Sequence, residues 1–407
     1  MISADYVSGS TPGAGQMTAC GTEQEQKRTQ FRKDQEDMNG NTANSIRNTF
    51  GFVGLGLIGG SIARAIRKYI TGARILAFTP HPETVQEAVS DGVVDEYVPV
   101  VGEGFSDCDV IFLCAPVEHN ASNLQLLKPW IREGMILTDV GSTKADIHRA
   151  VRAAGLQASF IGGHPMAGSE RIGYRNSKSG LLENAYYILT PEPEVSKDDI
   201  DWMFSFAETI KALPLVVSPK RHDYAVAAIS HVPHVISASL VNLVKESDDS
   251  SQFMKTIAAG GFKDITRISS SSPVMWEQIC MTNTDNIRIL LDRYIEDLLI
   301  FRKSLDSGDS RSINEFFDSA RRYRESFTDI SSGPINRSYI LHVDIEDRPG
   351  VLAEVVMYLA IAGINIKNIG ITHNREYQQG VLRVECHSSD GLLKARELLT
   401  NRNYSVY

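Results

Sequence analysis

Two residues of the sequence are suited to proton transfer. His164 follows an apolar run directly, and Gly163 and Pro165 restrict the backbone on either side of it. A histidine near its ordinary pKa can accept a proton from an alcohol while hydride leaves the same carbon. We prefer this role for His164 to that of a histidine hydrogen-bonded within a loop. Ser142 could bond that histidine or the substrate hydroxyl, and it could equally cap the helix expected near Lys144.

Further polar residues have the character of a substrate-binding site. Arg267 follows the turn expected at Gly260-Gly261, and its planar guanidinium could clamp a carboxylate while Asp264 holds it in place. A structural salt bridge between the two is the alternative. Glu170, in the segment after His164, could orient substrate or gate a cleft, although an exposed loop carboxylate is the commonest role for such a residue.

A pair of histidines lies within the most apolar helical segment. His231 and His234 are three residues apart and so share a helix face, a spacing also found in metal sites. No carboxylate accompanies them at helical spacing, so we expect no metal. Pro233 should kink the helix, and the kink could aim both imidazoles at a cleft.

A glycine pattern indicates a cofactor. Gly54, Gly56 and Gly59 fit G-x-G-x-x-G between a strand-like run and a helix-like run. In this reading Gly54 makes the tight turn, Gly56 admits a pyrophosphate and Gly59 lets helix and strand pack closely. A flexible turn is the alternative, but the context favours a dinucleotide at the helix N-terminus. The predicted cofactor contacts are Gly54, Leu55, Gly56, Leu57, Ile58, Gly59, Thr79, Pro116 and Ser142.

The second strand lacks the residue that an NAD site usually has. An acid near the end of that strand normally binds the ribose hydroxyls, but Thr79 stands at this position. No arginine follows at once to bind a 2′-phosphate. The choice between NAD and NADP is therefore open at this point.

Composition excludes several classes of protein. The 407 residues are 42% hydrophobic and 22% charged with a net charge of -9, which is typical of a soluble globular protein and argues against nucleic-acid binding. The five cysteines are scattered without C-x-x-C spacing, which favours a reducing compartment. We find no apolar run suited to a membrane span and no signal-peptide core, and we expect a cytoplasmic protein.

The order of elements predicts an α/β protein of three domains after a disordered tail at 1–48. Strands alternate with helices over 49–218, which predicts a Rossmann-type, doubly wound parallel sheet that binds ligands at the carboxyl ends of its strands. Residues 219–330 are predicted to be an all-helical substrate domain and dimer interface. The order β-α-β-β-α-β over 337–407 predicts a ferredoxin-like unit. The expected strands are 50–53, 74–78, 110–114, 136–140, 160–162, 186–189 and 215–217, and the expected helices after Pro219 are 221–245, 252–260, 273–282, 286–305 and 312–326.

Taken together, these motifs resemble the bacterial prephenate dehydrogenases of tyrosine biosynthesis that have a C-terminal ACT domain. The matching segments are 54–60, 139–144, 162–170, 222–224, 230–234, 258–267, 347–352 and 363–366. The resemblance covers the chain from about residue 49 to its end. The segments Gly163 to Ser169 and Phe262 to Arg267 are specific to that family, whereas the glycine turn is not.

The resemblance implies oxidative decarboxylation of prephenate with NAD to 4-hydroxyphenylpyruvate. His164 would accept a hydrogen bond from the ring hydroxyl, Arg267 would bind a carboxylate, and His234 would line the pocket together with His231. An arogenate dehydrogenase would share nearly every motif, and a non-catalytic sensor of nucleotide and amino acid is the alternative from another class. The ACT resemblance implies feedback inhibition by L-tyrosine, with ligand contacts expected at Asp347, Pro349, Gly350, Val351 and Asn365.

Overall fold

The computed structural model describes residues 47–168, 171–327, 339–346, 348–373 and 380–407. Contacts divide the chain into Met1–Asn48 and Thr49–Tyr407, and the helices and strands belong to the second unit. The predicted tail and the two acids Glu170 and Asp347 lie outside the described residues.

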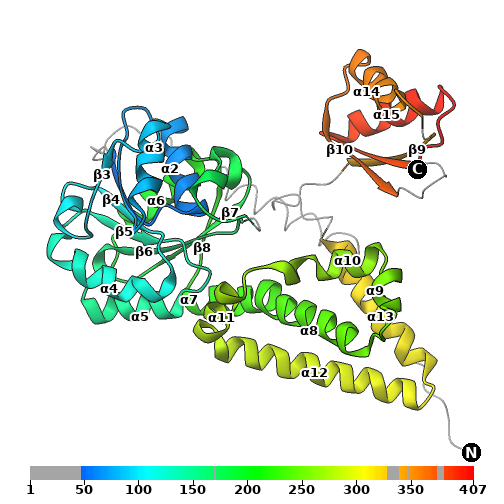
Figure 1. Cartoon of the computed structure of the whole chain (residues 1–407), viewed down its shortest axis with the longest axis horizontal. Helices are drawn as coiled ribbons and strands as arrows, with labels where there is room; N and C mark the ends of the chain where they lie inside the picture. Colours follow the sequence, from blue (N-terminus) through cyan, green and yellow to red (C-terminus); the bar gives the residue numbers. More distant parts are fainter. Residues whose placement is uncertain (1–46, 169–170, 328–338, 347, 374–379) are drawn as a thin grey trace, which may run out of the picture. The chain divides into compact units, whose positions relative to one another are not determined.

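The first part of this unit is built on a sheet of eight strands in the order β3-β2-β1-β4-β5-β6-β7-β8 (Figure 1). Each strand predicted from the sequence is present, and the two-residue β3 is additional. The bounds are β1 Thr49–Val53, β2 Arg74–Phe78, β3 Glu96–Tyr97, β4 Val110–Leu113, β5 Ile136–Asp139, β6 Phe160–Pro165, β7 Tyr186–Pro191 and β8 Leu213–Val216.

One pairing departs from the predicted parallel sheet, because β7 runs antiparallel to β6. The segment that joins them contains only the short 3-10 turns Tyr174–Asn176 and Ser179–Leu182 among its described residues. A parallel pair needs a crossover, usually a helix, to return the chain to the starting end. Without one, β7 begins at the carboxyl end of β6, where Met166 N donates to Tyr186 O at 2.8 Å.

Helices pack on both faces of this sheet. On β4, Val110 and Phe112 belong to one hydrophobic core, whereas Ile111 and Leu113 belong to the other, and all four are buried. This alternation follows from the two-residue period of a strand and explains why β4 is apolar throughout. The helices are α2 Leu57–Tyr69, α3 Pro82–Ser90, α4 Val117–Leu127, α5 Ala145–Ala154 and α6 Lys197–Thr209.

The next part is helical, as predicted, with one local difference. The helix expected at 252–260 is the shorter α9, and Gly260-Gly261 begin α10 where a turn was expected. The bounds are α7 Pro219–Val226, α8 Val232–Ser247, α9 Phe253–Ile257, α10 Gly260–Thr266, α11 Pro273–Thr282, α12 Thr284–Asp306 and α13 Ser310–Ser326. A π-helical turn, Ala227–His231, joins α7 to α8, so the chain is helical without a break from Pro219 to Ser247.

That continuous helix is long and apolar enough to cross a membrane by length and composition alone, which the sequence reading did not anticipate. Core helices of soluble proteins pass the same test. Its first turns carry Lys220, Arg221, His222 and Asp223, and the last two are buried in hydrogen bonds described below. Only 28% of its most apolar stretch is buried, and the buried, hydrogen-bonded His222 and Asp223 would be costly inside a bilayer.

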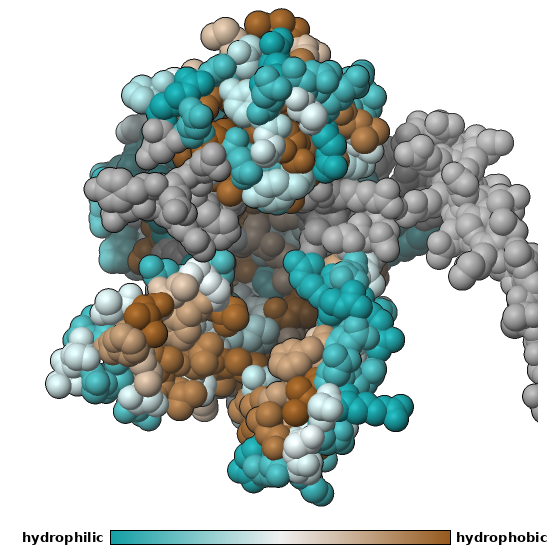
Figure 2. All heavy atoms as spheres, turned by 90° about the vertical axis from the view of Figure 1, so that its right-hand side faces the viewer, coloured by the Kyte–Doolittle hydropathy of each residue, from teal (hydrophilic) through white to brown (hydrophobic). Residues whose placement is uncertain are grey.

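Large apolar side chains remain exposed on the helical part. Figure 2 shows hydrophobic residues gathered on these helices. The exposed residues include Ile229, Leu243, Met281, Leu299, Ile300 and Phe317. A hydrophobic surface of this kind is typical of protein interfaces.

The last part is a small antiparallel sheet with two helices. Its strands lie in the order β10-β11-β9, and Val406 bridges to Val343 on the free side of β9. The element order β-α-β-β-α matches the prediction, whereas the last predicted strand is a single bridge. The bounds are β9 Tyr339–Ile345, α14 Val351–Ile361, β10 Ile366–His373, β11 Gly380–Cys386 and α15 Ser389–Thr400.

Candidate active site

His164 lies inside β6 and not after it, since that strand continues to Pro165. The backbone of His164 pairs with Ile188 of β7, and its side chain is buried. Its Nδ1 atom lies 2.8 Å from Nε2 of His222, which comes from α7. The strand therefore holds the histidine rigidly, and one ring nitrogen is already engaged by the protein.

The carboxylate of Asp223 anchors this contact. Its Oδ1 lies 2.8 Å from Nδ1 of His222 and accepts the backbone N–H of Lys144 at 2.8 Å, while Oδ2 accepts that of Ala145 at 2.8 Å. Asp223 thus binds the N-terminus of α5, where a negative charge is favoured. The alternative role of Ser142 as the cap of this helix was wrong, because the cap position is Lys144 and the side-chain acceptor comes from α7.

A buried ion pair supports the same strand end. Nζ of Lys144 donates to Oδ1 of Asp139 at 2.7 Å and to the carbonyl of Gly163 at 2.6 Å. Burial lowers the pKa of Lys144, and the Asp139 carboxylate opposes that shift. The pair ties β5 and α5 to the residue immediately before His164.

The surroundings of His164 favour its neutral form. Burial lowers its pKa well below the ordinary value, and the charges of His222, Lys144 and His231 act in the same direction. A neutral imidazole can accept a proton, whereas an imidazolium cannot. The environment keeps His164 in the form that can accept a proton, but the lowered pKa makes it a weaker base than the imidazole of ordinary pKa expected from the sequence.

His231 is buried and hydrogen-bonded within the protein. Nδ2 of Asn283 lies 3.1 Å from Nδ1 of His231. The same nitrogen donates a hydrogen bond to the backbone carbonyl of Asp223 at 2.8 Å. Oδ1 of Asn283 accepts from Asn286, so both ends of the amide are assigned. Burial lowers the pKa of His231 to about 4. An amide donor facing Nδ1 further disfavours protonation there.

His234 stacks on an aromatic residue that the sequence reading overlooked. The rings of His234 and Trp276 are 3.7 Å apart, and His231 approaches the same indole edge-on at 6.0 Å. The predicted shared face of the two histidines is therefore confirmed. Nε1 of Trp276 is buried and has no hydrogen-bond partner among the described residues. Burial lowers the pKa of His234, and the nearby charge of Arg267 contributes.

Arg267 begins a 3-10 turn that follows α10, and its side chain is exposed. The predicted support from Asp264 was wrong, because that carboxylate is exposed and forms no ion pair among the described residues. Asp264 lies in α10 and Arg267 in the 3-10 turn that follows it, and the turn expected before them at Gly260-Gly261 is the start of α10. Arg267 instead belongs electrostatically to the group around His234.

The glycine turn has a geometry that suits a dinucleotide. Gly54 has φ +99°, and a Cβ there would lie 2.6 Å from Ala115 N, while a Cβ on Gly59 would lie 2.8 Å from the Gly54 carbonyl. A Cβ on Gly56 would meet no atom within 4 Å. Gly56 is the N-cap of α2, which has no side-chain cap and no acid in its first turn. These features fit a phosphate at the N-terminus of α2.

Two other predicted cofactor residues lie at strand ends. Thr79 follows β2 directly and is buried, and its Oγ1 accepts the backbone N–H of His81 at 3.2 Å. Pro116 is the N-cap residue of α4, just after β4. Both residues lie beyond the carboxyl ends of their strands, where a doubly wound sheet binds its ligand. The hydroxyl of Thr79 also shapes the turn after β2.

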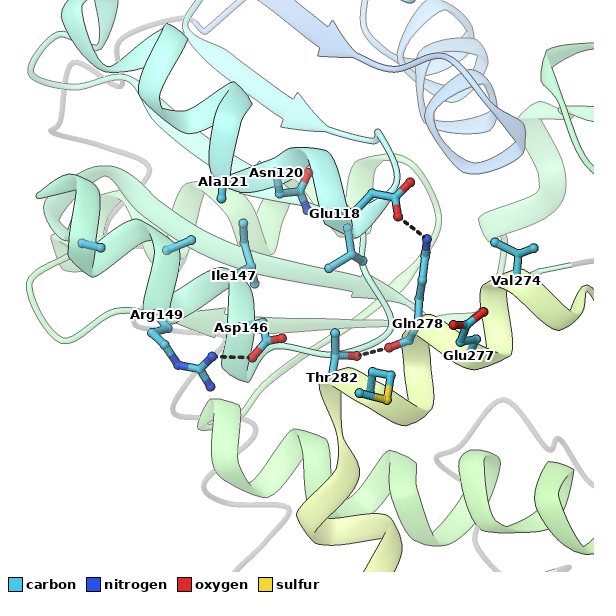
Figure 3. A pocket seen from close by; sticks show the side chains of 14 residues that line it. Glu118, Asn120, Ala121, Asp146, Ile147, Arg149, Val274, Glu277, Gln278 and Thr282 are labelled. Carbon is cyan, nitrogen blue, oxygen red and sulfur yellow. Dashed lines mark hydrogen bonds and ion pairs between the residues drawn. The ribbon is translucent and has the colours of Figure 1, made fainter.

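A separate cavity of about 590 Å³ lies between α4, α5 and α11 (Figure 3). Gln278 donates to Glu118 across it at 2.8 Å, and Thr282 bonds Thr143 at 3.0 Å. None of the predicted site residues lines this cavity. It joins the sheet part to the helical part and is distinct from the predicted site.

Four residues of the site escaped the sequence reading or were given no role in it: His222, Asp223, Trp276 and Asn283. His222 and Asp223 were noted only as a matching segment. Their signal was an adjacent histidine and acid in the first turns of a helix that begins with Ser218 as N-cap. Asn283 and Trp276 gave no local signal, since each acts on residues distant in sequence.

Two family profiles match the chain. "Prephenate dehydrogenase, nucleotide-binding domain" matches residues 62–215, and "Prephenate dehydrogenase, dimerization domain" matches residues 218–319. The chain is 36% identical over 361 residues to the prephenate dehydrogenase of Bacillus subtilis strain 168, covering 88% of this chain and 97% of that protein.

Two solved structures are similar to the sheet and helical parts. Prephenate dehydrogenase from A. aeolicus, in complex with hydroxyphenyl propionate and NAD+, is 27% identical with a TM-score of 0.65 and covers 69% of this chain and 98% of its own. Synechocystis arogenate dehydrogenase is 28% identical with a TM-score of 0.63 and covers 69% of this chain and 99% of its own.

Proposed function

The chain belongs to the prephenate dehydrogenase family of oxidoreductases, and we propose that it converts prephenate to 4-hydroxyphenylpyruvate and carbon dioxide with reduction of NAD. The observation that carries the proposal is His164, a buried imidazole near the carboxyl end of β6. Its lowered pKa favours the neutral form, and one of its ring nitrogens is hydrogen-bonded to His222. Such a group is poised to accept a proton from an alcohol.

In this reaction the protein positions and polarises, and the substrate provides the driving force. His164 accepts the proton of the ring hydroxyl while hydride leaves the same carbon. The bond to the ring carboxylate breaks, its electrons enter the ring, and carbon dioxide departs as the ring becomes aromatic. Arg267 binds a substrate carboxylate, His234 and Trp276 form a wall of the pocket, and Ser142 bonds the hydroxyl.

NAD supplies the hydride acceptor when it is bound. The uncapped N-terminus of α2 and the open space in front of Gly56 would hold its pyrophosphate. Thr79, Pro116 and Ser142 stand along the same strand ends. The NAD+ bound to the similar A. aeolicus enzyme supports this choice. Thr79 would bond the ribose through a hydroxyl where other sites use an acid.

Arogenate dehydrogenase is the second candidate, since the Synechocystis enzyme of that name is about as similar in structure as the A. aeolicus one. The higher identity to the B. subtilis prephenate dehydrogenase favours prephenate. The test is an absorbance assay of reduced cofactor with each of the four combinations of prephenate or arogenate with NAD or NADP. We expect reduced cofactor to form fastest with prephenate and NAD. Faster turnover of arogenate would reassign the substrate, and no turnover of either would favour a sensor.

The enzyme is proposed to work as a cytoplasmic homodimer. The match to a dimerization domain and the exposed apolar residues on α8, α11 and α12 support this assembly. Light scattering at working concentration should give twice the mass of one chain. A monomeric mass would contradict the dimer.

We place tyrosine feedback in the C-terminal unit, as an ACT domain. A match over 88% of the chain cannot fit within the first 338 residues, so the similarity to the B. subtilis enzyme extends into this unit. Gly350 is the N-cap of α14 and has φ +89°, the adjacent Pro349 is exposed, and Asn365 is exposed just before β10. Uncapped backbone N–H groups there could bind the carboxylate of an amino acid.

Truncation tests this regulation. Removing everything after Pro334 should leave dehydrogenase activity and abolish inhibition by L-tyrosine. Gly350→Ala in the full chain should weaken inhibition because φ is positive at that position. Inhibition that survives truncation would place tyrosine in the active site.

A further inference from the structure

Asp223 and His222 form a chain of hydrogen bonds that ends on His164. We propose that Asp223 is a positioning residue that determines, through His222, which ring nitrogen of His164 carries a hydrogen. The proposal rests on the proposed function, in which His164 accepts the hydroxyl proton. It adds a requirement that this function alone does not contain, namely one particular tautomer of His164 before substrate binds.

The direction of the chain is set at its Asp223 end. The side chain is buried, and its two oxygens accept the backbone N–H groups of Lys144 and Ala145, each at 2.8 Å. A backbone N–H can only donate, and an ionised carboxylate can only accept. Hydrogen bonding from His222 and from these backbone groups lowers the pKa of Asp223, in opposition to burial. Asp223 is therefore an acceptor, and Nδ1 of His222 must carry the hydrogen that it shares with Oδ1.

The same logic passes through His222 to His164. A neutral His222 that is protonated on Nδ1 has a lone pair on Nε2. That atom lies 2.8 Å from Nδ1 of His164, so His164 donates from Nδ1 and its own Nε2 is left without a hydrogen. The partner of one ring nitrogen determines the state of the other. The basic nitrogen of His164 is then Nε2, which is not used in the hydrogen bond to His222 and can accept the substrate proton.

The chain reverses only if His222 changes its protonation state. Donation from Nε2 of His222 needs either a second proton on its ring or the loss of its hydrogen on Nδ1. Loss of that hydrogen would leave Oδ1 of Asp223 facing a bare lone pair, which is electrostatically unfavourable. A second proton would be favoured by the Asp223 carboxylate 2.8 Å away, so the proposed tautomer of His164 requires His222 to stay neutral.

Asp223→Asn tests the direction with little change of shape. Oδ1 of Asp223 faces both the Lys144 N–H and Nδ1 of His222, so an amide NH₂ in its place would donate to His222 and lose the Lys144 bond, while the amide oxygen still accepts from Ala145. His222 would then carry its hydrogen on Nε2 and donate to His164, which would be protonated on the wrong nitrogen. We expect kcat with prephenate to fall by about 10²- to 10⁴-fold, the range for loss of general-base catalysis, with little change in the KM for prephenate.

The tautomer is read directly by ¹⁵N NMR of the full-length enzyme labelled on histidine, with His164→Asn identifying the His164 signals. The natural enzyme should show His164 with hydrogen on Nδ1, and Asp223→Asn should move it to Nε2. Hydrogen on Nε2 in the natural enzyme would overturn the proposal even if the variant failed to fold. A His164 tautomer that moves to Nε2 while kcat stays unchanged would overturn it as well.

Glu192→Gln is the matched control. Glu192 is a buried carboxylate 2.7 Å from Nδ1 of His148, in a histidine–acid pair that does not include His164. Its replacement should lower stability without moving the His164 tautomer, and a shift there would reduce Asp223 to a general structural role. Failure of the natural enzyme to turn over prephenate would contradict the proposed function. The NMR result would still show whether Asp223 determines the tautomer of His164.

Discussion

The ammonium nitrogen of Lys144 lies 2.7 Å from Oδ1 of Asp139, and solvent reaches neither side chain. The two residues are close in sequence, yet they join the end of β5 to the start of α5. The third contact of the ammonium, to the Gly163 carbonyl, ties this pair to β6 beside His164. The ion pair therefore supports the strand end on which the proposed base stands.

Breaking this pair should destabilise the fold strongly. Lys144→Met leaves the Asp139 carboxylate buried without its cation, and we expect the free energy of unfolding to fall by about 3–5 kcal/mol. Urea denaturation measures this loss. Asp139→Asn combined with Lys144→Met should lose less than the sum of the two single changes, because neither charge is then stranded. Additive losses would contradict the buried pair.

The pH dependence of turnover should reflect the neutral state of His164. Because its pKa is well below the ordinary value of about 6.5, the base should stay unprotonated as pH falls through that value. We expect kcat/KM with prephenate to stay level through pH ~6.5 and to decline only in more acid solution. His164→Asn should abolish nearly all turnover while cofactor binding persists. Near-normal turnover of this variant would remove His164 from the mechanism.

The stability of the protein should also depend on His231. Its folded-state pKa of about 4 lies below the value of about 6.5 in an unfolded chain, so only the unfolded state takes up a proton between these values. The stabilisation is complete above pH ~6.5 and is lost as pH falls toward 4, by up to roughly 3 kcal/mol. His231→Asn should flatten the pH dependence of the unfolding free energy in this window. An unchanged slope would show that His231 titrates normally.

Arg267 should act on substrate affinity. A charge-assisted hydrogen bond contributes roughly 1.5–3 kcal/mol, so Arg267→Ala should raise the KM for prephenate by about 10- to 150-fold and leave the KM for NAD nearly unchanged. Lys263→Ala is the matched control, since Lys263 is an exposed cation on the adjacent α10. Equal effects of Arg267→Ala on both KM values would indicate a structural role.

Two glycines of the nucleotide turn should respond differently to the same change. Gly56→Ala adds a methyl group that meets no protein atom within 4 Å, so stability should hold while the KM for NAD rises by about tenfold or more. Gly59→Ala would press its methyl group to 2.8 Å from the Gly54 carbonyl, and the stability loss should be about 1–3 kcal/mol. Thermal unfolding and cofactor titration separate the two effects. A normal KM for NAD in Gly56→Ala would move the phosphate site elsewhere.

Local patterns in the sequence were sufficient for most of the helices and strands of this protein. The apolar run of β4, the glycines before α2 and the order β-α-β-β-α of the last part each follow from periods or turns within a few residues. His164 and Arg267 stood out for the same reason, since each has an unusual immediate context. The antiparallel direction of β7 was not predicted from the sequence, because it depends on the absence of a crossover helix between β6 and β7.

Only the tertiary structure revealed how the site is held. Asp223 accepts the backbone N–H of Lys144, the N-cap of α5, from 79 residues away, and Asn283 bonds His231 across 52 residues. The sequence alone offered Ser142 as one candidate for that cap and Asp264 as one candidate support of Arg267, because both are near neighbours of the groups concerned. A hydrogen bond is satisfied by whichever partner packing brings within reach, and α7 brings Asp223 to α5. The hydrogen-bond chain from Asp223 through His222 to His164 therefore depends on the packing of α7 and could not be predicted from local sequence.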